Sequence, residues 1–305
     1  MEKNEPLVSV NVLMYNSSKY ILETLESIKA QTYQNIELIM SDDKSTDNTI
    51  QICEKWIAQN KDRFTSYQIL VPDHNTGQSG NYNRAFRAAT GEWIKEIDGD
   101  DLLTPESLTN LVSYAQEHPD AKYIFGDMSY FYDTIKKKKI KPFKTDTLFF
   151  SESINKQLEL MLEGNRLSSP TSFYNREFIR NINFENDERI PNMEDWPKWI
   201  SLLDKGVKFY HCNKPVALYR VGSGISTQKR DSLRYYRSLE LFDLFYRYPR
   251  MAQQDPIKAA NWMADRHCKI YADLLQAESQ INTIKSNSGL HIISKIRHFF
   301  KCMRH

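Results

Sequence analysis

Short apolar runs alternate with helical repeats over the first 130 residues of the chain. Nearly continuous apolar runs at residues 7–14, 36–40, 67–71 and 93–97 predict buried strands. Between them, apolar residues recur at helical spacing in residues 18–31, 47–56 and 80–90. Strands that alternate with helices form mostly parallel sheets with right-handed crossovers. The pattern therefore predicts an α/β fold with a Rossmann-like, mostly parallel sheet flanked by helices.

Two of the expected helices begin with residues that favour a helix start. Ser17 or Ser18 precedes the first helix and is suited to accept backbone N–H groups there. Thr104 precedes a helix that starts near residue 105, with Pro105 at its first position. We therefore expect side-chain N-caps at both sites.

From about residue 231 the pattern becomes wholly helical, which predicts a helical C-terminal region. The Gly222-Ser223-Gly224 stretch marks the boundary, so we expect domains at 1–228 and 229–305. Residues 290–305 place isoleucine, phenylalanine and methionine on one helical face and add four lysine or arginine residues. This basic amphipathic helix favours peripheral contact with an anionic membrane surface. The alternatives are packing on its own domain and a dimer contact.

Composition narrows the class of protein. Hydrophobic residues make up 40% of the 305, enough for a sizeable core, and a net charge of only +2 argues against a nucleic-acid partner. The four cysteines are far apart and lack zinc-site spacing, which is typical of free thiols in a reducing compartment. The N-terminus lacks a signal-like apolar run, and no stretch is long enough to span a bilayer. We expect a cytoplasmic protein that reaches the inner face of the plasma membrane only peripherally.

Two acidic loops follow predicted strands, at the edge where open α/β sheets bind ligands. One loop is residues 41–47 and the other contains Asp98-Gly99-Asp100. In an extended loop, residues two apart point the same way, so Asp98 and Asp100 can face one cation. Carboxylate oxygens suit Mg²⁺ or Mn²⁺, which would take further ligands from a diphosphate and from water. The alternative is a solvated acidic turn before a helix.

An ordered series of motifs gives these loops a context, and it covers about residues 6–225. The motifs are Tyr15-Asn16, Ser41-Asp42-Asp43-Lys44-Ser45-Thr46-Asp47, Asn75-Thr76-Gly77, Ala89-Thr90-Gly91-Glu92-Trp93 and Asp98-Gly99-Asp100. In order and spacing the series resembles family-2 glycosyltransferases. The whole series is a far more specific signal than any one of its motifs. The resemblance implies the GT-A type of α/β fold and a nucleotide-sugar donor.

The resemblance also implies roles for single residues. Asp43 matches the family carboxylate that accepts a hydrogen bond from uracil N3–H, which cytosine lacks. Tyr15 matches the position that lies against the base, where its ring would stack; the alternative is a half-buried core tyrosine. Asp98 and Asp100 match the ligands of a Mn²⁺ or Mg²⁺ ion that binds the diphosphate.

A further acidic pair, Glu194-Asp195, stands at the predicted start of a helix. Asp195 best matches the family's catalytic base, which removes the proton of the acceptor hydroxyl. The alternative is a helix start at which acidic residues are favoured by the helix dipole. Because the chain also carries the Asp98-Gly99-Asp100 motif, we favour the role of catalytic base for Asp195.

Two positions depart from the family pattern. Tyr82 stands where many relatives have arginine, and Arg84 lies two residues further on. The family ending Tyr-Arg-His-x-x-Ser-x-Ser reads here from Tyr219-Arg220-Val221, without the histidine. Any metal or phosphate role of that histidine is therefore not expected here.

The sequence therefore predicts an inverting, metal-dependent transferase acting in bacterial polysaccharide synthesis. It would move a sugar, most simply from a UDP donor, to a hydroxyl of a saccharide or lipid-linked saccharide. A non-catalytic nucleotide- or lipid-binding protein on the same fold is the alternative. A glycoside hydrolase also uses paired carboxylates, but the uracil-type loop and the Asp98-Gly99-Asp100 motif argue against it. A nicotinamide dehydrogenase is disfavoured because no GxGxxG follows the first strand.

Overall fold

The computed structural model describes residues 5–132, 139–190, 193–222, 233–269 and 272. The chain divides into two compact units, Met1–Gln228 and Lys229–His305. The segment 290–305, expected to be a basic amphipathic helix, lies outside the described residues. Within the described part of the chain, no helix is long and apolar enough to cross a membrane.

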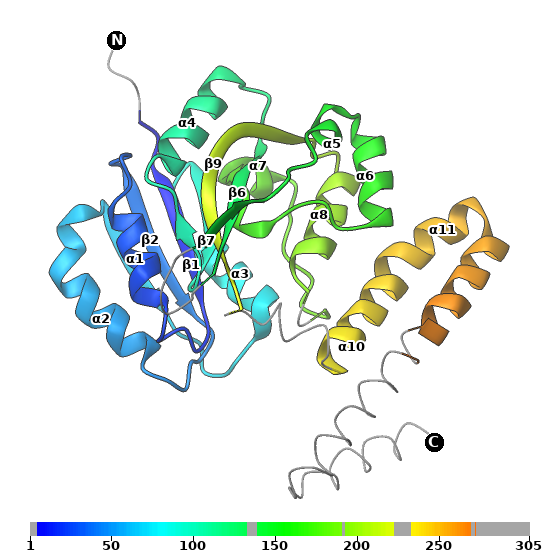
Figure 1. Cartoon of the computed structure of the whole chain (residues 1–305), viewed down its shortest axis with the longest axis horizontal. Helices are drawn as coiled ribbons and strands as arrows, with labels where there is room; N and C mark the ends of the chain where they lie inside the picture. Colours follow the sequence, from blue (N-terminus) through cyan, green and yellow to red (C-terminus); the bar gives the residue numbers. More distant parts are fainter. Residues whose placement is uncertain (1–4, 133–138, 191–192, 223–232, 270–271, 273–305) are drawn as a thin grey trace, which may run out of the picture. The chain divides into compact units, whose positions relative to one another are not determined.

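The first unit alternates strands and helices (Figure 1). In chain order they are β1 (Val8–Met14), α1 (Ile21–Lys29), β2 (Ile36–Asp42), α2 (Thr49–Asn60), η1 (Lys61–Arg63), β3 (Ser66–Leu70), α3 (Gly77–Ala88), β4 (Trp93–Asp98), β5 (Leu102–Leu103), α4 (Ser107–Glu117), β6 (Tyr123–Tyr132), β7 (Lys139–Pro142), α5 (Thr147–Ser151), α6 (Ile154–Glu163), η2 (Ser169–Thr171), β8 (Ser172–Asn175), α7 (Arg176–Asn181), α8 (Asp195–Asp204) and β9 (Phe209–Val221).

The described strands form one sheet in the order β3-β2-β1-β4-β8-β6-β9-β5, with β7 paired to β6. The first four strands of this order are parallel. β8 runs antiparallel to both β4 and β6, and β6 is parallel to β9. The predicted α/β class with a mostly parallel sheet is confirmed.

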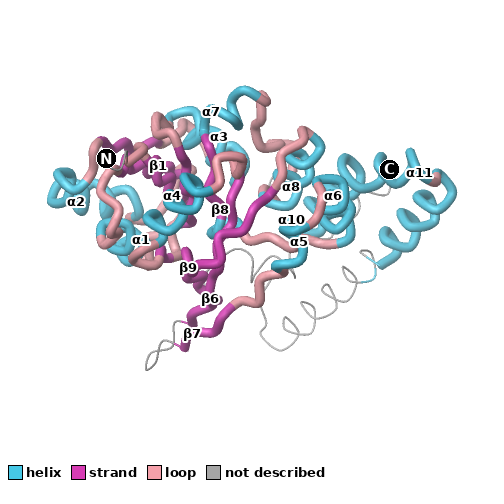
Figure 2. The backbone as a smooth tube through the Cα atoms, turned by 90° about the horizontal axis from the view of Figure 1, so that it is seen from above, coloured by secondary structure: helices cyan, strands magenta, loops and turns pink. Residues whose placement is uncertain are grey.

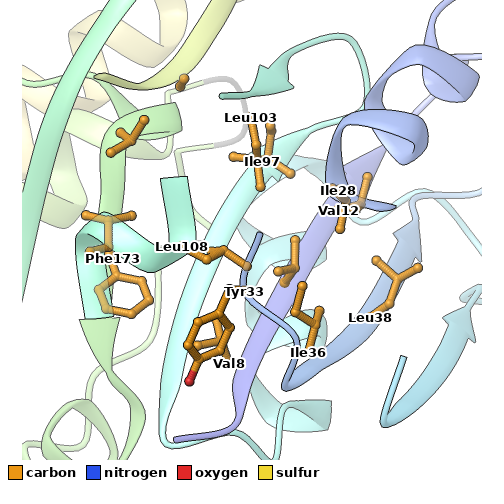
Figure 3. Packing of buried hydrophobic residues seen from close by; sticks show 14 of the residues in the cluster. Val8, Val12, Ile28, Tyr33, Ile36, Leu38, Ile97, Leu103, Leu108 and Phe173 are labelled. Atoms are coloured by element: carbon orange, nitrogen blue, oxygen red, sulfur yellow. The ribbon is translucent and has the colours of Figure 1, made fainter. Parts of the chain in front are cut away.

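The main core lies between the sheet and the helices α1, α2 and α4. Right-handed crossovers from β1 to β2 and from β2 to β3 place α1 and α2 on one face. The hydroxyls of Thr32 and Thr109 lie 2.8 Å apart, which ties the end of α1 to α4 on that face. Figure 3 shows Val12, Leu38 and Ile97 of the strands packed near Ile28 and Leu108 of these helices. In Figure 2, α3 and α7 lie on the opposite side of the strands from α1 and α4.

A buried carboxylate closes the amino-terminal edge of the sheet. Glu37 of β2 accepts hydrogen bonds from the Ser9 hydroxyl at 2.5 Å and from the amide and hydroxyl of Thr90, each at 2.8 Å. Burial opposes its ionisation, but these hydrogen bonds outweigh burial and lower the pKa of Glu37. The bonds fix the turn between α3 and β4 against β1.

Both predicted side-chain N-caps are wrong. α1 begins at Ile21 after Tyr20 without a side-chain cap, and the backbone carbonyl of Ser17 accepts the amides of Tyr20 and Ile21, each at 2.9 Å. α4 begins at Ser107 after Glu106, again without a side-chain cap. The Thr104 hydroxyl donates instead to the carbonyl of Pro215 in β9, at 2.7 Å, so a tertiary partner takes up this side chain.

The second unit contains α10 (Leu233–Phe242), a π-helical turn η3 (Asp243–Arg247), α11 (Tyr248–Gln254) and a helix over residues 256–269. Buried Asp243 pairs with Arg247 at 3.1 Å and with Arg266 at 3.0 Å. These pairs join the π-helical turn to the last described helix. Cys53, Cys212 and Cys268 are free thiols.

Gly91 provides a test of the close packing at the amino-terminal edge. A Cβ atom there would lie 2.6 Å from the Ser9 amide nitrogen and 2.8 Å from the Leu7 carbonyl oxygen, both backbone atoms that cannot turn away. Gly91→Ala should therefore lower the free energy of unfolding by about 1–3 kcal/mol. Gly164→Ala is the control, because nothing lies within 4 Å of a Cβ at that position. Urea unfolding of both variants checks this, and equal midpoints would contradict the packing argument.

Candidate active site

The end of β1 brings the two acidic loops together. β1 lies between β2 and β4, with Met14 opposite Asp42 and Leu13 opposite Asp98. Beyond these pairs, the Met14 carbonyl accepts the Asp43 amide at 2.8 Å, and the Leu13 carbonyl accepts the Gly99 amide at 2.9 Å. Both loops are therefore attached to the last two residues of one strand, at the carboxyl edge where such sheets bind ligands.

The Asp43 carboxylate lies next to the first residues of α3, and protein groups occupy most of its hydrogen-bond acceptor positions. Its Oδ1 accepts the amide and the hydroxyl of Thr76, at 2.9 and 2.6 Å, and pairs with Arg84 at 3.2 Å. Its Oδ2 accepts the amide of Gly77 at 2.8 Å. A carboxylate oxygen has two acceptor positions, so Oδ2 keeps one for an outside donor. The side chain is 4% exposed, which restricts that donor to one direction.

Tyr15 directly follows β1, and 44% of it is exposed. The next residue, Asn16, has a positive φ of 52°, and its side-chain oxygen accepts the Thr46 amide at 2.8 Å. These contacts hold the turn after β1 against the loop after β2. The exposed Tyr15 thus leaves the sheet beside Asp43, at the same edge.

The second acidic loop is a tight turn packed on the segment after β1. The Asp101 amide donates to the Asp98 carbonyl at 3.1 Å. A Cβ at Gly99 would lie 3.0 Å from Ser17 Oγ and 3.3 Å from Met14 Cγ. The glycine therefore permits close packing against β1 and α1, on the side away from solvent. Asp98 and Asp100 stay partly exposed on the loop.

Arg220, at the end of β9, makes two hydrogen bonds to this loop. Its amide donates to Asp101 Oδ1 at 2.8 Å, and its Nε donates to the Asp100 carbonyl at 2.8 Å. The guanidinium is fully buried between the rings of Tyr20 and Phe131, at 4.3 and 4.4 Å. Burial, and then the charges of Asp100 and Asp98, raise the pKa of Asp101 well above its usual range.

The loop's donor atoms fit a hard divalent cation. Asp98 and Asp100 offer carboxylate oxygens, the ligands that Mg²⁺ and Mn²⁺ prefer. The described residues contain no group of three or more histidine, cysteine, aspartate or glutamate side chains placed to hold a metal. A cation here would therefore take its remaining ligands from a diphosphate and from water, as Mg²⁺ commonly does.

Asp195 is the first residue of α8 and is partly exposed. Its Oδ2 accepts the side-chain amide of Asn165 at 2.8 Å, and its Oδ1 accepts the Trp196 amide at 2.7 Å. Glu194, just before it, is 8% exposed and buried. Of the two acidic residues, Asp195 is therefore the one that solvent or a substrate reaches more easily.

Tyr82 of α3 is buried where side chains of β4 and α8 meet. Lys198 Nζ of α8 lies 4.2 Å from the centre of the Tyr82 ring and pairs with Glu96 of β4 at 2.8 Å. Burial, and then the charges of Asp98, Glu194 and Glu96, raise the pKa of the Tyr82 hydroxyl well above its usual value. This hydroxyl lies 3.0 Å from Ser169 Oγ.

Five residues at or next to this site were not assigned roles from the sequence: Arg220, Asp101, Arg84, Lys95 and Glu96. Arg220 and Asp101 fix the acidic loop, and Arg84 pairs with Asp43. The position of Arg220 in the family's Tyr-Arg ending was the available signal. For Lys95 and Glu96, the signal was a pair of charged residues inside an otherwise apolar run, since buried charges require partners.

The mostly parallel sheet, with both acidic loops at its carboxyl edge, has the GT-A type of α/β fold. Residues 9–182, more than half of the chain, match the family described as glycosyl transferase family 2. The chain therefore belongs to this glycosyltransferase family, and the predicted family is confirmed.

Named relatives agree with this assignment. The chain is 29% identical over 219 residues to the Escherichia coli UDP-Glc:alpha-D-GlcNAc-diphosphoundecaprenol beta-1,3-glucosyltransferase WfaP, covering 72% of this chain and 78% of WfaP.

Two solved structures share the fold. S. aureus TarS 1–349 in complex with UDP-GlcNAc has a TM-score of 0.58 at 21% identity, over 78% of this chain and 66% of that one; the chain spans 39% of a longer TarS chain. The mannosyltransferase PcManGT from Pyrobaculum calidifontis, in complex with GDP-Man and Mn²⁺, has a TM-score of 0.57 at 16% identity, over 99% and 81%.

A buried lysine beneath the site gives stability a pH dependence. Lys95 Nζ donates to the carbonyls of Glu96 and Pro170, at 2.8 and 2.5 Å. Burial lowers the pKa of Lys95 to about 7, whereas unfolded lysine titrates near 10.4. Between these values the unfolded chain binds one more proton than the folded chain, so stability rises with pH.

We therefore expect the free energy of unfolding to rise from pH 7 to 8.5, with a contribution from Lys95 of up to about 1.4 kcal/mol per pH unit. Lys95→Met should remove that contribution, because methionine does not titrate. Lys55→Met, at an exposed position of α2, is the control and should keep the wild-type slope. Urea unfolding at three pH values checks this; identical slopes for wild type and Lys95→Met would contradict it.

Proposed function

We propose that this glycosyltransferase moves a sugar from a UDP donor to a hydroxyl of a saccharide or lipid-linked saccharide, with inversion at the anomeric carbon. The observation that carries the proposal is the arrangement at the end of β1. There Asp43 and the Asp98–Asp100 loop are bonded to consecutive carbonyls, and the Glu96–Lys198 ion pair joins the strand of that loop to α8. The site for the uracil ring, the site for the diphosphate and the carboxylate that would deprotonate the acceptor hydroxyl would thus be adjacent.

The donor assignment depends on Asp43 and Tyr15. Oδ2 of Asp43 retains one acceptor position, which N3–H of uracil would fill, and the exposed ring of Tyr15 would stack on the base. The relative WfaP is named for a UDP-Glc donor, and TarS was solved with UDP-GlcNAc. PcManGT was solved with GDP-Man, and guanine also offers an N–H. The Asp43 carboxylate would therefore discriminate against cytosine, but it would not by itself distinguish uracil from guanine.

The metal assignment depends on Asp98 and Asp100. Either Mn²⁺ or Mg²⁺ would be held by these carboxylates and would neutralise the charge that grows on the leaving diphosphate. The Mn²⁺ in the PcManGT complex supports this class of ion. The Arg220 bonds to the Asp100 carbonyl and to Asp101 would hold the loop that carries Asp100 in place beyond the end of β4.

In the proposed step, Asp195 takes the proton of the acceptor hydroxyl as that oxygen attacks the anomeric carbon, and the diphosphate leaves from the opposite face. The Asn165 amide bonded to Oδ2 orients the carboxylate and leaves Oδ1 shared only with the Trp196 amide.

For an undecaprenyl-type acceptor, the basic segment 290–305 would bring the enzyme to an anionic membrane surface. Co-sedimentation with anionic vesicles that weakens at high salt would support this contact, and salt-independent binding would argue against it.

The function as a whole is tested by incubating the purified chain with Mn²⁺, an undecaprenyl-diphosphate saccharide and a panel of donors, and by measuring nucleotide diphosphate release. The panel contains UDP-Glc, UDP-GlcNAc, GDP-Man and a CDP-sugar. Transfer from a UDP-sugar supports the proposal. Tight UDP binding without transfer from any donor would favour the alternative, a non-catalytic nucleotide-binding protein.

UDP should bind more tightly than CDP by about 1–3 kcal/mol, because Asp43 would face the bare N3 lone pair of cytosine. Calorimetric titrations with and without Mn²⁺ measure this difference. Nucleotides are compared here in place of an Asp43 variant, because Asp43 also bonds the amides at the start of α3. Equal affinities for UDP and CDP would remove Asp43 from the base site.

Asp195→Asn should lower turnover by roughly 10²-fold or more while UDP affinity stays unchanged, since the amide keeps the shape of the carboxylate but does not accept a proton. Asp204→Asn is the matched control: it makes the same chemical change at the exposed, carboxyl-terminal end of the same helix. Steady-state kinetics at saturating donor compare the two. Wild-type turnover in Asp195→Asn would transfer the role to another group, with Glu194 as the nearest candidate.

A further inference from the structure

A buried ion pair joins the strand of the acidic loop to the helix of the proposed base. Lys198 Nζ lies 2.8 Å from Glu96 Oε2, and both side chains are 3% exposed. Glu96 Oε1 accepts the hydroxyl of Tyr174 in β8 at 2.5 Å. Lys198 Nζ also lies 4.2 Å from the centre of the Tyr82 ring in α3. One ammonium group thus contacts side chains of both β4 and α3.

Each residue of the pair lies close in sequence to a proposed active-site residue on the same element. Lys198 is three residues after Asp195 on α8, so both lie on one face, about one helical turn apart. Glu96 is two residues before Asp98 on β4, so both side chains leave the same face of the sheet. A shift at the pair is therefore passed to Asp195 and Asp98 through only three residues of α8 and two residues of β4.

The ion pair borders a small cleft of about 20 Å³, with room for about one water molecule. The cleft wall also includes Asn83, Phe86, Tyr174 and Phe184. On this side of α8, the ion pair and the Tyr174 hydrogen bond are directional, so they specify the position of the helix more narrowly than apolar contacts do.

A buried pair of this kind adds little stability, because the cost of removing two charges from water offsets their attraction. What it supplies is a fixed geometry. We infer that Lys198 is a positioning residue: its pairing with Glu96, against Tyr82, sets the distance between the start of α8 and the end of β4. Its catalytic consequence rests on the proposed function, whereas its effect on the position of α8 does not.

The test uses the double variant Glu96→Gln/Lys198→Met. It removes both charges together, so no buried charge is left unpaired, and the glutamine oxygen still accepts the Tyr174 hydroxyl. The control is Arg87→Met/Glu185→Gln, which removes the exposed pair between α3 and the loop after α7. Both double variants lose one positive and one negative charge.

For the Glu96/Lys198 double variant we expect an unfolding midpoint and a UDP affinity close to those of the wild type. Amide exchange over residues 193–198, measured without substrate, should be at least tenfold faster. The kcat should fall at least tenfold, with the donor KM changed less than threefold. The control should match the wild type in all five measurements. Tyr174→Phe, which removes only the bond to Glu96, should change exchange and kcat in the same direction by a smaller factor.

Unchanged exchange and kcat in the Glu96/Lys198 double variant would overturn the inference, because the pair would then be structural only. Faster exchange with wild-type kcat would overturn its catalytic part. If the double variant no longer folds, Tyr174→Phe decides alone, by the same two measurements. A wild-type chain without transferase activity would refute the proposed function, and the exchange measurement would still test the positioning of α8.

Discussion

The pairing of β1 with β2 on one side and β4 on the other is the constraint on which the site depends. A parallel register carries the ends of three strands to one edge, and the last two carbonyls of β1 accept the amides of both acidic loops. Neither loop needs to be rigid by itself, because each is fixed by a backbone hydrogen bond to a fully buried strand. Helices α1, α2 and α4 pack on one face of that strand and keep it in place.

Next to these loops, the site contains several buried ionisable groups. Asp101 and Lys95 are fully buried, and the Asp43–Arg84 and Glu96–Lys198 pairs are largely shielded from water. Each group is costly to bury unless hydrogen bonds replace its hydration. Those bonds are present: Arg220 and Pro170 serve Asp101 and Lys95, and Thr76 and Tyr174 serve the two pairs. These groups add little stability, but their hydrogen bonds fix their positions around the partly exposed carboxyl edge of the sheet.

The replacement of arginine by Tyr82 shows how the site accommodates a departure from the family pattern. The Tyr82 ring packs under the Lys198 ammonium, and its hydroxyl lies beside Ser169. Arg84, two residues further along the same helix, supplies the cation next to Asp43. A positive charge thus lies at the proposed uracil site, and a second one, on Lys198, lies between α3, β4 and α8.

The sequence by itself determined the elements of about the first 100 residues and their order. Residues 7–14, 36–40 and 93–97 predicted β1, β2 and β4 to within one or two residues, because strands buried on both faces appear as continuous apolar runs. The alternation with helices then determined the parallel part of the sheet, and the carboxyl-edge rule placed both acidic loops at one edge. Contacts between distant residues were decided only by the tertiary structure. The Thr104 hydroxyl, predicted to cap a helix, donates to Pro215, 111 residues away. Arg220 reaches Asp101 across 119 residues, and Lys198 reaches Glu96 across 102. Local periodicity reports which face of an element is buried, but it carries no information on which polar group of another element lies opposite. Packing of the whole sheet and its helices alone determines those partners.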